Sequence, residues 1–226
     1  MQRSTPSPLE VVAPARRSAR GRWLDWLLAA GWVAGISAAL VSVSSYKLTP
    51  GSPATALLSQ WPADSAIAMD DARPTLVVFA HPRCPCTAAT LAELREILAY
   101  RSTRVATTVA IERWADDPAG AVRGDRWKEA EAIPGVRVIE DLEGREAERF
   151  GATTSGHVVL YAPDGRLLFA GGITPGRGHV GASPQRERLE ALLDGRDVDL
   201  PPTSAPHPLS RLVAGAVYGC PLQDRP

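Results

Sequence analysis

The segment over residues 74–98, PTLVVFAHPRCPCTAATLAELREIL, decides the fold of this 226-residue chain. It begins with the β-branched and aromatic run Leu76–Phe79, bounded by prolines, which favours a buried strand over a helix of that length. After the CPC triplet at 84–86, apolar residues recur every three or four positions, as in a helix packed on a sheet. The sequence therefore predicts a strand, then two cysteines at the N-terminus of an amphipathic helix.

A second informative segment lies near the N-terminus. The run Trp26–Tyr46 carries no charged residue, and about 20 apolar residues is the length that a helix needs to cross a bilayer. Five arginines and a single glutamate precede it within residues 1–22, so the positive-inside rule predicts a cytoplasmic N-terminus. A cleaved signal peptide is the alternative, although the run exceeds the roughly 7–15 residues of a typical signal core. We expect a single-pass cell-membrane protein with its domain on the periplasmic or extracytoplasmic side.

The rest of the chain is expected to serve these two segments. We predict a basic tail over 1–23, a transmembrane helix over 24–46, a linker over 47–73, a domain over 74–195 and a C-terminal tail over 196–226. Within the domain, local patterns predict further strands at 104–111, 136–139, 157–161 and 167–171 and helices at 127–133, 145–150 and 184–193, in the order βαβαβαββα. Trp61 of the linker is a candidate for docking on the domain. The zero net charge, from 25 basic and 25 acidic residues, gives no indication of a nucleic-acid partner.

Two segments carry a family resemblance. PTLVVFAHPRCPC with its helix, and later FGATTSGHVVLYAPDGRLLFAGGIT, resemble the signature segments of thioredoxin-like proteins over roughly residues 62–195. The resemblance is closest to membrane-anchored members of the TlpA type, particularly RedB-like proteins, whose HPRCPC and GCPL segments are similar. It implies an α/β fold, a thioredoxin-like three-layer α/β/α sandwich with a mixed central sheet, after one N-terminal transmembrane helix. It also implies a redox-active cysteine pair at the first strand-to-helix junction.

Two departures from the family pattern affect the chemistry. Only Pro85 separates the cysteines, whereas thioredoxins have two intervening residues, so Cys84 matches the usual attacking position and Cys86 does not match the usual resolving one. Gly156 stands where the family has a cis-proline that faces the cysteine pair. Glycine can follow the same backbone path but lacks the constraint. Both departures weaken the case for ordinary disulfide exchange with protein substrates.

Cys84 is expected to react as a thiolate, because a thiol with an unperturbed pKa of about 8.5 is mostly protonated at neutral pH. The helix N-terminus and the charge of Arg83 predict a lowered pKa, and His81 contributes if its ring turns toward the sulfur. Cys86 is the expected resolving thiol, although a bridge between cysteines one residue apart is strained and readily reduced. Cys220 is the alternative resolving thiol, or a structural staple for the tail.

We therefore predict a membrane-tethered thiol–disulfide oxidoreductase that needs no cofactor and acts on a protein or small thiol or disulfide substrate. Three cysteines leave one unpaired in any monomer, which leaves room for a disulfide-linked dimer. The alternative is a copper- or zinc-binding module with ligands drawn from Cys84, Cys86, His81, His157 and His179, because soft thiolates select these metals. A redox-inactive scaffold and a peroxidase are further alternatives, although a peroxidase favours threonine at position 81.

Overall fold

The computed structural model describes residues 19–52, 58–118, 120–196 and 215–222. The chain forms two compact units, residues 1–44 and residues 45–226. The first unit contains most of helix α1 (Ala19–Leu48). From Trp23 onward this helix is long and apolar enough to span a membrane, a property that it shares with signal sequences near an N-terminus. The helix thus agrees with either an anchor or a signal sequence.

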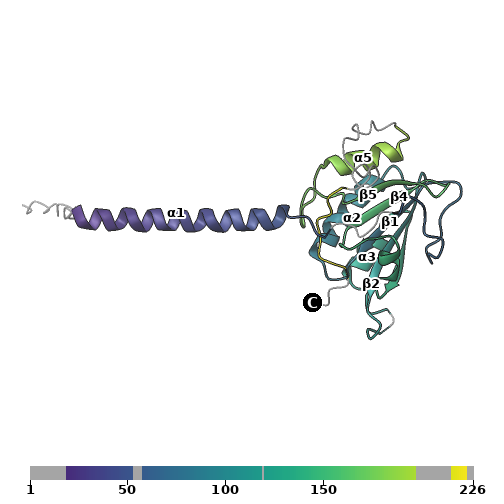
Figure 1. Ribbon diagram of the computed structural model, residues 1–226, viewed down its shortest axis with the longest axis horizontal. Helices are drawn as coiled ribbons and strands as arrows, with labels where there is room; N and C mark the ends of the chain where they lie inside the picture. The colour runs from purple at the N-terminus through teal and green to yellow at the C-terminus, as the bar shows by residue number, and fades with distance from the viewer. Residues whose placement is uncertain (1–18, 53–57, 119, 197–214, 223–226) are drawn as a thin grey trace, which may run out of the picture. The chain divides into compact units, whose positions relative to one another are not determined.

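A five-stranded mixed sheet forms the centre of the second unit (Figure 1). Its strands are β1 (Thr75–Ala80), β2 (Ala106–Arg113), β3 (Val136–Leu142), β4 (His157–Tyr161) and β5 (Leu167–Gly171), in the order β3-β2-β1-β4-β5. Strands β1, β2 and β3 run parallel, while β4 is antiparallel to β1 and to β5. Every residue of the central strand β1 is buried. That burial on both faces explains why its sequence is a continuous apolar run instead of an alternation.

Helices cover both faces of the sheet and make three layers. They are α2 (Pro85–Leu98), α3 (Asp125–Glu131), α4 (Arg145–Arg149) and α5 (Pro184–Leu193). Apolar side chains of α2, α3 and α5 share one core with the sheet, and α4 packs into the core on the opposite face. The observed order of elements confirms the predicted βαβαβαββα.

Local signals set several element boundaries. Ser183 caps α5 by accepting a hydrogen bond from the Arg186 N–H, and Pro184 occupies the first helical turn. Gly165 has φ 83° in the turn between β4 and β5, as the predicted hairpin requires. Strand β3 continues past the predicted end at Ile139 to Leu142, because its last residues still pair with β2. This extension was invisible to an apolar pattern, since its added residues include two acids.

The second half of the predicted linker packs on the domain. Trp61 docks edge-on against Phe150 and Tyr161, with ring centroids 4.9 and 5.2 Å away, which confirms its predicted docking. Ile67 is buried in the same core. Ser65 donates a hydrogen bond to the carboxylate of Glu146 at 2.6 Å. The structure therefore places the segment from residue 58 onward within the packing of the domain, although its prolines and missing periodicity predict a spacer.

The described part of the C-terminal tail, residues 215–222, also lies on the domain. Gly215 donates its N–H to the carbonyl of Ala170 at 2.8 Å, and Gly172 donates to the carbonyl of Ala216 at 3.2 Å. Val217 and Leu222 are buried. Backbone hydrogen bonds thus attach the beginning of this segment to β5, and the buried side chains of Val217 and Leu222 hold the rest of it on the domain.

Candidate functional site

The first two cysteines lie at the junction of β1 and α2, where the sequence predicts them. Cys84 is the N-cap residue of α2, with φ −77° and ψ 125°, and Pro85 follows in the first turn. Proline is tolerated there because the first N–H groups of a helix have no intrahelical partner. The carbonyl of Cys84 accepts a hydrogen bond from the Thr87 N–H at 3.1 Å. Cys84 and Cys86 are only 1% and 5% exposed, so neither sulfur is open to a bulky partner.

The C-terminal segment brings the third cysteine to the same place. It runs antiparallel to residues 153–155: Ser155 donates its N–H to the carbonyl of Cys220 at 2.8 Å, and Leu222 donates to that of Thr153 at 2.8 Å. The Sγ atoms of Cys84 and Cys220 are hydrogen-bonded at 2.8 Å, and all three cysteines are free thiols. The fold thus unites two sulfurs that lie 136 residues apart in the sequence.

The close approach of the tail depends on glycine. A Cβ at Gly219 would collide with the carbonyl oxygen of Ser155, so only glycine fits beside this loop. The guanidinium of Arg177 donates a hydrogen bond to the carbonyl of Gly219 at 2.5 Å. A Cβ at Gly172 would lie 2.7 Å from the carbonyl oxygen of Ala216. The segment that carries Cys220 is therefore held by close contacts with Ser155, with Arg177 and with Gly172 just after β5.

Cys84 holds the thiolate of this group. The side-chain hydrogen bond from Cys86 is the largest cause that lowers the pKa of Cys84 to about 4, with burial opposing it and Cys220 assisting. The same hydrogen bond, followed by burial, raises the pKa of Cys86. Burial, and then the bond to Cys84, raises the pKa of Cys220 to about 11. These shifts favour the thiolate at Cys84 and the protonated thiol at Cys86 and Cys220.

The other neighbours predicted from the sequence take different positions. Arg83 is exposed, and its backbone N–H donates to Nδ1 of His81 at 3.1 Å. The His81 ring packs against Trp114 with ring centroids 5.3 Å apart. Nδ1 of His81 is thus engaged by the loop backbone. The hydrogen bonds that lower the pKa of Cys84 come from the two other cysteines, whereas a contribution from Arg83 stays a prediction.

Gly156 lies just before β4, in the loop that carries the tail. Its φ is 87°, its N–H donates to the carbonyl of Phe79 at 2.8 Å, and a Cβ would lie 2.7 Å from Oγ1 of Thr90. Its neighbour Ser155 was not singled out from the sequence. Oγ of Ser155 accepts a hydrogen bond from the His81 N–H at 3.0 Å and lies 2.9 Å from Oγ1 of Thr87. Ser155 therefore connects the tail, through its own N–H, to the β1–α2 junction, and no local sequence signal marks that role.

His157 faces away from helix α2. It pairs with Phe79 across the sheet, and directly opposed residues of antiparallel strands point to the same face. That face carries the core of Phe79 and α4, whereas α2 packs on the other. His157 is 3% exposed, and burial lowers its pKa to about 4, so the ring is neutral at neutral pH. His157 is thus a buried sheet residue, on the face opposite to that of α2.

The metal alternative finds no cluster to support it in the described part of the chain. Among those residues, no group of three or more His, Cys, Asp or Glu side chains is arranged to hold a metal ion. His179 is exposed, and its Nδ1 lies 2.8 Å from the carbonyl oxygen of Arg177.

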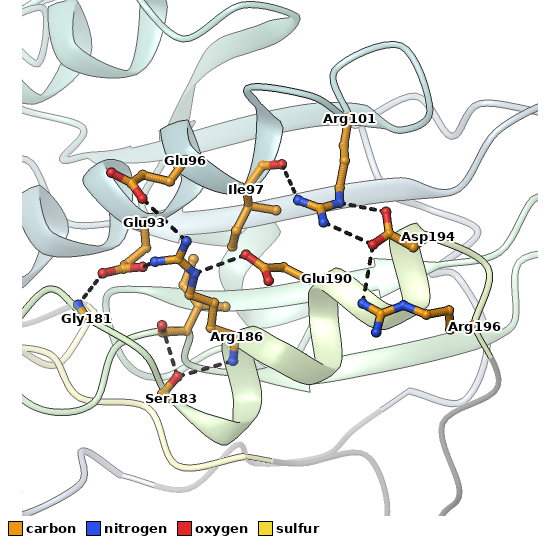
Figure 2. Close-up of polar contacts among 11 residues, drawn as sticks. Glu93, Glu96, Ile97, Arg101, Gly181, Ser183, Arg186, Glu190, Asp194 and Arg196 are labelled. Atoms are coloured by element: carbon orange, nitrogen blue, oxygen red, sulfur yellow. Dashed lines mark hydrogen bonds and ion pairs between the residues drawn. The ribbon is translucent and has the colours of Figure 1, made fainter.

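A polar network ties the loop between β5 and α5 to helix α2 (Figure 2). Glu93 of α2 is 2% exposed, accepts the Gly181 N–H and forms an ion pair with Arg186 of α5. Arg186 also reaches Glu190 at 3.1 Å. In the same loop, the Gly178 N–H donates to the sulfur of Cys86. The network thus fixes a loop that supplies a backbone donor to the thiol group.

Comparisons with known proteins agree with this fold. No known protein-family profile and no curated protein matches the chain. A hypothetical protein from Sinorhizobium meliloti 1021 is 20% identical with a TM-score of 0.51, over 78% of this chain and 94% of that one. An uncharacterized conserved protein from Geobacillus kaustophilus is 16% identical with a TM-score of 0.49, over 79% and 94%. A secreted disulfide oxidoreductase from Mycobacterium tuberculosis, homologous to DsbE of E. coli, is 17% identical with a TM-score of 0.37, over 54% and 81%.

The fold is thioredoxin-like, as the sequence predicts. The mixed sheet, its helices on both faces and the cysteines at the first strand-to-helix junction all have the expected order. The narrower RedB-like assignment stays a prediction.

Proposed function

We propose that this chain is a membrane-tethered thiol–disulfide oxidoreductase in which Cys84 and Cys220 form the exchanging pair. The observation that carries the proposal is the 2.8 Å contact between their sulfurs, and the lowered pKa of Cys84 supports it. The thiolate is the species that attacks and leaves in disulfide exchange. A helix N-cap that holds a thiolate against a second thiol is therefore equipped for this chemistry.

Cys220 is a better resolving partner than Cys86. A disulfide requires Cβ atoms about 3.5–4.5 Å apart and a dihedral near 90°, which two cysteines in one helical turn reach only with strain. Cys220 approaches on a separate segment held by backbone hydrogen bonds, so it is free of that restriction. Cys86 instead hydrogen-bonds to Cys84 and lowers its pKa. We assign Cys86 to stabilising the thiolate.

The exchange moves two electrons between the pair and a substrate. In the reducing direction, a cysteine of the pair and one half of a substrate disulfide form a mixed disulfide, and the other half leaves as a thiolate. The second cysteine then attacks the protein sulfur of the mixed disulfide, which closes the Cys84–Cys220 bond and releases the remaining thiolate. Two protein thiols are oxidised and one substrate disulfide is reduced, and every step is reversible.

The apolar helix supports a tether to the cell membrane with the domain outside the cytoplasm. Helix α1 is long enough to span a bilayer, and the arginines that precede it favour a cytoplasmic N-terminus. A reporter enzyme fused after residue 60 should be active on the extracytoplasmic side. Activity of that fusion in the cytoplasm alone would refute the orientation.

Disulfide mapping tests the proposed function. The full chain, purified in detergent, is equilibrated in glutathione buffers from reducing to oxidising, and its bonds are located by mass spectrometry. We expect a reversible Cys84–Cys220 bond that persists in a Cys86→Ser variant. The proposal fails if no bond forms in any buffer, or if a Cys84→Ser variant reduces a small disulfide as fast as the parent.

A further inference from the structure

We propose that Cys220 is the sulfur that meets the substrate and that Cys84 is the buried leaving thiolate, so that the chain oxidises thiols. The inference rests on the proposed Cys84–Cys220 pair and assigns the direction of its chemistry. It reverses the order expected from the sequence, in which Cys84 makes the first attack. Exposure, the surroundings of each sulfur and the fastening of the tail carry it.

Exposure differs between the two sulfurs. Cys84 is 1% exposed beneath the tail, while Cys220 is half-buried. Attack on a disulfide takes place at the sulfur that the incoming thiolate can reach, and expels the other one. An external thiolate is therefore expected to bond to Sγ of Cys220 and to displace Cys84 toward the domain.

The surroundings of Cys84 are built to receive a negative charge. The Cys86 thiol donates to its sulfur and lowers its pKa to about 4, whereas the pKa of Cys220 is about 11. A thiol of lower pKa is the faster leaving group, and a stabilised thiolate makes the reduced form the stable one, as in strongly oxidising members of the disulfide exchange class. Attack at Cys84 would instead expel the poorer leaving group.

The tail has no need to leave during this reaction. The carbonyls on either side of Cys220 are held: that of Gly219 by Arg177, and that of Cys220 itself by the Ser155 N–H. Val217 and Leu222 anchor the segment in the core at both sides. If the segment over residues 215–222 were loosely attached, it could move away and expose Cys84 to direct attack. These contacts instead hold the segment in place, so that Cys220 is the sulfur exposed to a substrate.

The proposed oxidation balances. A substrate thiolate attacks Sγ of Cys220, a mixed disulfide forms, and the Cys84–Cys220 bond breaks with its electron pair on Cys84. A second thiolate of the substrate attacks the substrate sulfur of the mixed disulfide, which forms the substrate disulfide and releases Cys220 as a thiolate that takes a proton. A more oxidising external disulfide reloads the pair by the reverse steps. The substrate class is therefore a dithiol, or two thiols.

The test locates the mixed disulfide. The oxidised full chain in detergent reacts with reduced glutathione, is quenched with acid at successive times, and is mapped by mass spectrometry. We expect the glutathione adduct on Cys220. An adduct mainly on Cys84 overturns the inference but leaves the proposed function standing, whereas the absence of a Cys84–Cys220 bond before glutathione is added refutes the proposed function itself.

A second variant keeps the inference testable where the adduct is short-lived. The Cys86 thiol is the largest cause that lowers the pKa of Cys84 and the smallest cause named for Cys220. Replacing Cys86 by alanine therefore removes stabilisation chiefly from a thiolate at Cys84. If Cys84 leaves, the Cys86→Ala change should slow reduction of the oxidised chain by glutathione by about threefold or more. An unchanged rate means that Cys220 is the leaving sulfur, and overturns the inference.

Discussion

The hydrogen bond from Cys86 to Cys84 gives the sharpest quantitative prediction. It is the largest cause that lowers the pKa of Cys84 to about 4. A Cys86→Ala substitution removes this donor and leaves in place the contribution of Cys220, which also lowers the pKa of Cys84. The pKa of Cys84 in the variant should therefore rise, but remain below that of an unperturbed thiol.

The size of the change follows from the strength of a hydrogen bond to a charged group. Such a bond contributes about 1.5–3 kcal/mol, and one pKa unit corresponds to about 1.36 kcal/mol. Loss of the Cys86 donor should raise the pKa of Cys84 by about 1–2 units. Loss of the neighbouring thiol also opens a small gap, which does not change the direction of this effect.

Thiolate absorbance at 240 nm measures this pKa in the reduced full chain. Cys86 and Cys220 have raised pKa values, so titration below neutral pH reports Cys84 alone. An Arg83→Gln variant is the matched control, because Arg83 is exposed and the cysteine bonds persist. It should move the titration by less than about half a unit, in keeping with a screened surface charge. The reasoning is refuted if Cys86→Ala leaves the titration where it was, or if Arg83→Gln moves it further.

Three more substitutions, each made in the full chain, test the tail, the ion pair between α2 and α5, and the buried histidine of the sheet. Gly219→Ala should strain the tail by about 1–3 kcal/mol and lower the equilibrium constant of disulfide formation roughly 5- to 150-fold in glutathione buffers, whereas Gly124→Ala, which meets open space, should not. Arg186→Met leaves the buried carboxylate of Glu93 without its cation and should lower the free energy of unfolding by about 3–5 kcal/mol in denaturant titrations. Glu96→Gln, which removes an exposed partner of the same arginine, should lower it by less than about 1 kcal/mol. Burial lowers the pKa of His157 from 6.5 in the unfolded chain to about 4 in the folded one, so the free energy of unfolding should fall by about 3 kcal/mol as the pH drops from 6.5 to 4. A His157→Gln variant should lose this pH dependence, and a variant with the same pH dependence as the parent would show that another group is responsible.

Local sequence patterns determined the elements that hold the first two cysteines. The apolar run of β1 and the spacing of leucines in α2 predict a strand and a helix on physical grounds that act within a few residues. The same applies to the Ser183 cap of α5 and to the Gly165 turn, whose geometry depends on one side chain or one positive φ. An apolar helix near the N-terminus is likewise visible in composition alone.

The tertiary structure decided which groups meet. Cys220 joins Cys84 across 136 residues because its backbone pairs with residues 153–155, and such pairing has no signature within either segment. The sequence favoured Cys86 as the resolving thiol because it is near in the chain, and it favoured Arg83 as the source of positive potential. In space, Cys86 is a hydrogen-bond donor to Cys84. Sequence separation governs local conformation, but the pKa of a sulfur and its reaction partner depend on the distance to neighbours that only packing brings together.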